Sequence, residues 1–67
     1  MRRFMITVYT TENCRYWYAI DAEDYNRPRE HAKRILLEGY WEILGCGTEQ
    51  MHAPWRIIKV KIEEVTK

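Results

Sequence analysis

The chain has 67 residues, which allows one small domain with a single core and excludes a second core. Its formal net charge is +1, so overall charge gives no long-range attraction for a polyanion. Its two cysteines, Cys14 and Cys46, are too few and too far apart for a disulfide scaffold and favour a reducing intracellular setting.

The first predicted strand covers residues 3–10, "RFMITVYT". Apolar and β-branched residues alternate there, which is typical of a strand with one buried face. We expect Phe4, Ile6 and Val8 to point inward. Residues 11–13, "TEN", then form a tight hairpin loop, because Asn13 tolerates a left-handed backbone conformation.

The second predicted strand, "CRYWYAID" at residues 14–21, has two possible registers, and a shift of one residue exchanges its faces. A three-residue loop pairs Val8 with Tyr16, whereas a two-residue loop buries Trp17 beside two charged residues. We favour the three-residue loop, since burying a charge without a partner is costly. The inward side chains are then Cys14, Tyr16, Tyr18 and Ile20, and the outward ones are Arg15, Trp17, Ala19 and Asp21.

The segment "AEDYNRPREHAKRILLEGY" predicts the only helix. Asp24 or Asn26 serves as its N-cap, Pro28 is tolerated in the first turn, and Gly39 is a stop signal. The apolar stripe that packs on the sheet consists of Ala32, Ile35 and Leu36, with Pro28 or His31 before them and Gly39 after them.

Two further strands are predicted after the helix, at residues 40–46 and 55–65, with a loop at 47–54. In the first of them Trp41 and Ile43 are expected to face inward, and Tyr40, Glu42 and Leu44 outward. In the second, Ile58, Val60 and Ile62 are expected to share the inner face, opposite Ile57, Lys59, Lys61 and Glu63. The prediction is an α+β fold: a single ββαββ domain over residues 1–67, with one helix packed on a four-stranded, mainly antiparallel sheet of undetermined strand order.

The sequence contains few of the features expected of a catalytic or metal site. Cys14, His31, Cys46 and His52 lack the close spacing of zinc ligands. A Cys46–His52 nucleophile pair has no evident third group to orient it, and no glycine-rich phosphate loop is present. We therefore expect no metal, no small-molecule cofactor, no catalytic residues and no enzymatic activity.

The most informative feature is the outward face of the predicted sheet, because one helix covers only one side of it. Exposed aromatic and apolar side chains of this extent are typical of interaction surfaces. The expected partner-binding residues are Tyr9, Arg15, Trp17, Tyr40, Ile57, Lys59 and Lys61. The four aromatic and apolar members of this set, Tyr9, Trp17, Tyr40 and Ile57, provide contact area, and the basic members set the orientation of the partner.

We accordingly expect a small non-enzymatic interaction or regulatory protein that binds a protein partner, or a second copy of itself as a homodimer, through this face. The alternative is a single-stranded nucleic-acid-binding module, in which bases stack on the aromatic rings and lysines meet phosphates. The sequence lacks the β-α-β-β-α-β order and the glycine-aromatic strand of RNA-recognition sheets, so no family resemblance is drawn. A third possibility is peptide addition to the edge of the last strand.

The first residues of the chain lack the apolar run of a signal peptide, and no segment reaches the length that crosses a bilayer. We expect a cytoplasmic protein that makes no membrane contact.

Overall fold

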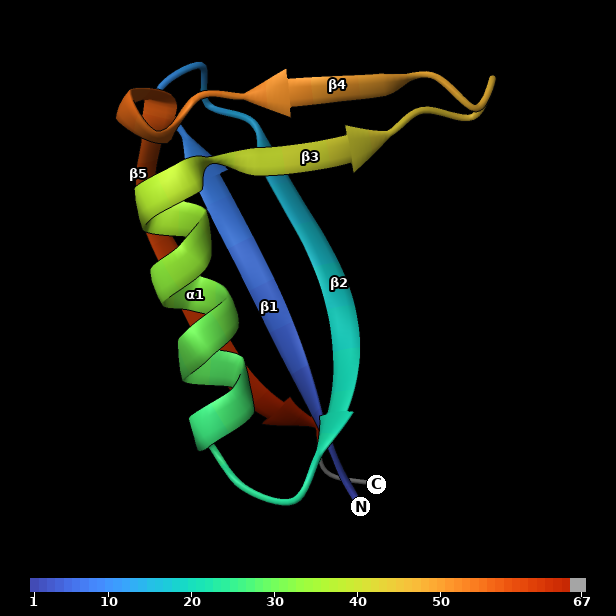
Figure 1. The fold of residues 1–67 in the computed structure, drawn as a ribbon, viewed down its shortest axis with the longest axis vertical. Coiled ribbons are helices and arrows are strands. Elements are labelled where there is room, and N and C mark those ends of the chain that lie inside the picture. Colours follow the sequence, from blue (N-terminus) through green and yellow to red (C-terminus); the bar gives the residue numbers. More distant parts are fainter. Residues whose placement is uncertain (66–67) are drawn as a thin grey trace.

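The structure is a computed structural model that describes residues 1–65, in which one α-helix is combined with two separate antiparallel sheets (Figure 1). The main sheet has the order β2-β1-β5 and consists of β1 (Arg2–Thr10), β2 (Arg15–Ala22) and β5 (Ile57–Val65). The remaining elements are α1 (Asn26–Glu38), the hairpin strands β3 (Tyr40–Ile43) and β4 (Glu49–His52), and a short 3₁₀-helix, η1 (Pro54–Arg56). The α+β class and the mainly antiparallel pairing are confirmed, but three strands and two strands replace the expected single four-stranded sheet.

The register of β1 and β2 agrees with the predicted three-residue loop. Val8 lies opposite Tyr16, and Asn13 has a positive φ of 61° at the end of the loop. The inner side chains of β1, Phe4, Ile6 and Val8, are fully buried. Trp17 is 63% exposed on the opposite face, because this register sends the odd-numbered residues of β2 away from the core.

A β-bulge corrects the prediction for the start of the last strand. Tyr9 lies opposite Lys59, but Thr10 lies opposite Ile57, so Ile58 is an extra residue in the ladder. Ile57 is consequently buried at 8% exposure, and Ile58 is 61% exposed. The predicted outward position of Ile57 and inward position of Ile58 are therefore wrong, since the alternation of the sequence contains no sign of the extra residue.

Helix α1 begins and ends close to its predicted limits. The residue at the N-cap position is Tyr25, which makes no side-chain cap hydrogen bond, so the predicted N-cap of Asp24 or Asn26 is wrong. The Asp24 carboxylate, one residue before the cap, accepts a hydrogen bond of 2.9 Å from the Asn26 backbone N–H. At the other end of the helix, the Gly39 N–H donates a hydrogen bond of 2.8 Å to the Ile35 carbonyl. Pro28 and Ile35 are buried against the sheet. Leu36, expected in the buried stripe, is 48% exposed because it lies at the margin of the helix face that contacts the sheet.

The β3–β4 hairpin differs most from the prediction. It crosses over β2 in Figure 1 instead of extending the main sheet, and β4 occupies part of the segment expected to be a loop. Tyr40 packs against the core cluster, whereas Trp41 is 57% exposed and Ile43 is 74% exposed. The predicted faces of this strand are therefore reversed. A two-residue period predicts which side chains share a face, but the direction of the chain after Gly39 decides which face meets the core.

Gly39 sets that direction. Its φ of 95° and ψ of −178° lie in a region of backbone conformation open essentially to glycine alone. A Cβ at this position would lie 2.4 Å from the backbone oxygen of His52 and 2.7 Å from the Met51 methyl group. The end of the helix, the first residue of β3 and the last residue of β4 therefore meet where only glycine fits.

We predict that Gly39→Ala destabilises the fold by at least about 1–3 kcal/mol, because it combines backbone strain with a close approach to His52. Gly47→Ala is the matched control, since Gly47 has a φ of 86° with no atom near the added methyl group. Gly45→Ala introduces neither backbone strain nor a close contact. Urea unfolding should give the order Gly39→Ala, Gly47→Ala, Gly45→Ala from largest to smallest loss. Equal losses for Gly39→Ala and Gly47→Ala would contradict the close contact.

Candidate interaction face

The elements that cover the main sheet lie on one side of it. Helix α1 packs on the face that carries Phe4, Ile6 and Val8, and the hairpin meets the same face through Tyr40. The ring of Tyr40 stacks on those of Tyr16 and Tyr18, with centroids 5.7 Å and 6.1 Å away. Among residues 1–65, no helix or second sheet packs on the other side.

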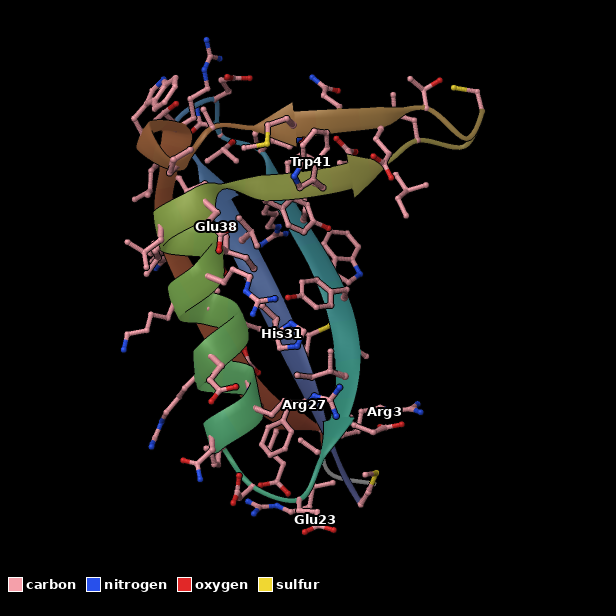
Figure 2. The ribbon with its side chains drawn as sticks, in the orientation of Figure 1. Arg3, Glu23, Arg27, His31, Glu38 and Trp41 are labelled. Carbon is pink, nitrogen blue, oxygen red and sulfur yellow. The ribbon has the colours of Figure 1, made fainter. Side chains whose placement is uncertain are left out.

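We call that other side the helix-free face. The strand registers place four rows of side chains on it: Arg15–Tyr9–Lys59, Trp17–Thr7–Lys61, Ala19–Met5–Glu63 and Asp21–Arg3–Val65. Figure 2 shows Arg3 pointing away from α1 at one end of this face.

The first two rows form a basic and aromatic half. The Lys59 ammonium lies 4.8 Å from the centroid of the Tyr9 ring, which is within the range of a cation–π interaction. Tyr9 is flanked on its other side by Arg15. Among residues 1–65, neither Arg15 nor Lys59 forms an ion pair with an acidic side chain. Their charges are therefore available to an anionic group on a partner.

The remaining charged side chains of the face neutralise one another in two pairs. Arg3 donates a hydrogen bond of 3.1 Å to Asp21, and this bond lowers the pKa of the Asp21 carboxyl. The Lys61 ammonium lies 2.7 Å from Glu63, which raises the pKa of Lys61. Both pairs are exposed, so each contributes little to stability. The excess positive charge of the face is thus concentrated near Tyr9.

The predicted partner-binding residues divide between the two sides of the sheet. Tyr9, Arg15, Trp17, Lys59 and Lys61 share the helix-free face. Tyr40 and Ile57 do not, because Tyr40 stacks on the helix side and Ile57 is buried in the core by the bulge. These two residues belong to the packing that supports the sheet.

Sequence reasoning missed a second surface, which we call the aromatic groove. It is an open groove of about 650 Å³ between β2, α1 and β3. It is lined by Arg15, Tyr16, Trp17, Tyr18, His31, Tyr40, Trp41, Glu42 and Ile43. His31 points from α1 toward β2 in Figure 2, and its Nδ1 shares a hydrogen bond of 3.1 Å with the Tyr18 hydroxyl. The groove was not predicted because it depends on the path of the hairpin.

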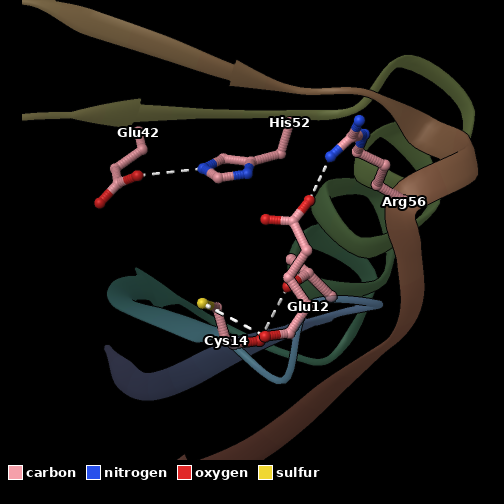
Figure 3. Close-up of polar contacts among 6 residues, drawn as sticks. Glu12, Cys14, Glu42, His52 and Arg56 are labelled. Atoms are coloured by element: carbon pink, nitrogen blue, oxygen red, sulfur yellow. Dashed lines mark hydrogen bonds and ion pairs between the residues drawn. The ribbon is translucent and has the colours of Figure 1, made fainter.

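His52 of the hairpin and Arg56 of the adjoining η1 connect these elements to the β1–β2 end of the main sheet, the first by ring packing and the second by an ion pair (Figure 3). His52 is buried, its Nε2 lies 3.0 Å from a Glu42 carboxylate oxygen, and its ring packs 4.6 Å from that of Tyr16. Arg56 of η1 forms an ion pair with Glu12 in the β1–β2 loop. These contacts hold the wall of the aromatic groove over the start of β2.

The residues considered for metal binding or catalysis are separated. Cys14 and Cys46 are both free and exposed, and the Cys46 thiol is 3.1 Å from the Thr48 hydroxyl, whose hydrogen bond lowers the pKa of Cys46. His52 contacts Glu42 instead of Cys46. In the described part of the chain, no three His, Cys, Asp or Glu side chains are grouped so that they could hold a metal ion. The helix over residues 26–38 is too short and too polar to cross a bilayer.

Comparisons of the chain with protein-family models, with curated proteins and with solved structures found no match.

Burial of Tyr18 gives a testable pH dependence. Loss of solvation and, to a lesser degree, the influence of Tyr40 raise the pKa of Tyr18 from the ordinary tyrosine value of 10.0 to about 12. The folded state therefore holds the phenol proton more tightly than the unfolded state does. Its contribution to stability is complete below pH 10 and is lost as the pH rises toward 12.

We predict that chemical denaturation across this alkaline range shows a fall in the free energy of unfolding, and that the fall is smaller in Tyr18→Phe. Ultraviolet difference spectra at the same pH values should show that Tyr18→Phe has one ionising tyrosine fewer than the wild type at the alkaline end of the titration. An unchanged alkaline profile in Tyr18→Phe would contradict the assignment to this residue.

Proposed function

We propose that this protein is a small non-enzymatic interaction protein whose helix-free face binds an acidic surface of a protein partner. The observation that carries the proposal is the one-sided cover of the main sheet: α1 and the hairpin pack on the same face. The exposed face combines an aromatic anchor, Trp17, with the two cations that flank Tyr9.

The chemistry of the face supports an acidic partner. Trp, Tyr and Arg are the residue types that most often dominate the binding energy of protein interfaces. Arg15 and Lys59 lie on opposite sides of Tyr9, so one carboxylate-bearing segment placed over that ring would meet both charges. The free, exposed Cys14 and Cys46 are consistent with action in a reducing compartment such as the cytoplasm.

We predict that the Trp17→Ala variant weakens partner binding by roughly tenfold or more, and that the Lys59→Glu/Lys61→Glu double variant does the same. Trp55→Ala and Lys33→Glu are matched controls, because Trp55 is 80% exposed on η1 and Lys33 is exposed on α1. Affinity capture from a cell extract, quantified for each variant, should recover the same protein with wild type and both controls, and much less of it with the face variants. Equal recovery with Trp17→Ala and Trp55→Ala would refute the proposed face.

Single-stranded nucleic acid is the second candidate, and the proximity of Tyr9 and Trp17 to basic side chains favours it. In this case three phosphate contacts, to Arg15, Lys59 and Lys61, would give a slope of about −2 in a plot of log affinity against log salt concentration. Fluorescence anisotropy of a labelled single-stranded oligonucleotide measures that slope directly. A flat salt response, or no binding at low salt, eliminates the nucleic-acid function and leaves the protein partner.

A further inference from the structure

Strand β2 forms one edge of the main sheet, because it pairs with β1 alone. The Thr10 N–H donates to the Cys14 carbonyl across the loop, which fixes the alternation of hydrogen-bonded pairs along the two strands. The backbone groups of Arg15, Trp17, Ala19 and Asp21 therefore point away from β1. No proline or bulge interrupts the eight residues of β2, so its edge is open to another extended strand.

We propose that two copies of this chain pair antiparallel through their β2 edges, about a two-fold axis at Tyr18, and form one continuous six-stranded sheet. The alternation of edge-facing backbone groups requires odd-numbered residues to lie opposite odd-numbered residues. The axis at Tyr18 satisfies this condition. It creates hydrogen-bonded pairs between Trp17 and Ala19 of the second copy, and between Arg15 and Asp21 of the second copy.

Charge and size both select this register. Arg15 and Asp21 lie at opposite ends of the same face of β2, so a two-fold axis midway between them places each Arg15 beside Asp21 of the other copy. That Asp21 also accepts the hydrogen bond from Arg3 of its own chain, so each Arg15 would join an existing ion pair. The large Trp17 side chain then faces the small Ala19. Moving the axis to Trp17 places Arg15 opposite Ala19, and moving it to Ala19 places Trp17 opposite Asp21, so neither alternative pairs Arg15 with Asp21.

The other edge of the sheet is less suited to pairing. β5 carries Lys59 and Lys61 two residues apart on the helix-free face, and edge lysines discourage pairing between copies. The uninterrupted edge of β2, in contrast to the bulged and lysine-bearing edge of β5, therefore favours β2 as the site of self-association, and the Arg15–Asp21 complementarity identifies the occupant of the edge as a second copy.

The hairpin supports the same arrangement. It projects past β2 in Figure 1, on the side from which a second strand would approach, and its residues Trp41 and Ile43 line the aromatic groove beside β2. Pairing at the edge would extend the floor of this groove with Ile20 of the second copy. The exposed apolar side chains of β3 would then be covered, which adds apolar area to the main-chain hydrogen bonds.

Charge reversal tests the register. Sedimentation equilibrium from micromolar to millimolar concentration should show a wild-type dimer, and Arg15→Asp or Asp21→Arg alone should weaken it by roughly tenfold or more, because each places like charges together twice. Mixing the two variants should restore the dimer, since position 15 of each variant then faces an opposite charge at position 21 of the other. Circular dichroism of each variant controls for folding.

Hydrogen exchange gives a second measurement that requires no substitution. The amides of Trp17 and Ala19 point to the edge, so their exchange should slow as the protein concentration rises, while the amide of Tyr18, already bonded to β1, should not respond in that way. A wild-type protein that remains monomeric, or a variant mixture no heavier than its components, overturns the proposal. The Lys59→Glu/Lys61→Glu double variant separates this proposal from the partner-binding face, because both lysines lie on β5, away from the β2 edge, whereas Trp17→Ala alters both surfaces.

Discussion

The packing of α1 and Tyr40 against one face of β1 is the constraint on which the rest of the structure depends. Phe4, Ile6 and Val8 supply the fully buried side chains of β1, and residues 1–65 contain no further helix or strand that packs on the opposite face. The same constraint that gives the domain a core therefore leaves aromatic and basic side chains in solvent on the other side of the sheet.

The two open surfaces have different chemistry. The helix-free face offers side chains, with positive charge concentrated around Tyr9, and is suited to recognising an acidic group. The β2 edge offers backbone hydrogen bonds, with charge used only to fix the register. Trp17 lies where the two surfaces meet, so self-association through the edge would join two helix-free faces into one surface across the two-fold axis.

Sequence patterns predicted the elements whose position is decided locally. The register of β2 followed from keeping Arg15 and Asp21 in water, and the helix followed from its stop at Gly39 and its apolar stripe. The face of β3 could not be obtained this way, because it depends on the direction in which Gly39 sends the chain. β4 has mostly polar residues, and only His52 is buried, so its sequence has no strand-like alternation. The sequence pattern predicted that Tyr9 and the outward residues of β2 share a face with Lys59 and Lys61 of β5. It placed Tyr40 and Ile57 on that face as well, which is wrong because their positions depend on tertiary packing.

The bulge at Ile58 also determines where the length of this chain can vary. Without that residue, Ile57 would directly precede Lys59 in an unbroken ladder, and Thr10 and Tyr9 would remain their partners on β1. Loss of one residue there preserves both surfaces of the sheet, whereas loss of one residue further along β5 would exchange the inward and outward side chains on one side of the deletion. Evolutionary gain and loss of single residues in this strand should therefore be tolerated at the bulge and removed by selection elsewhere.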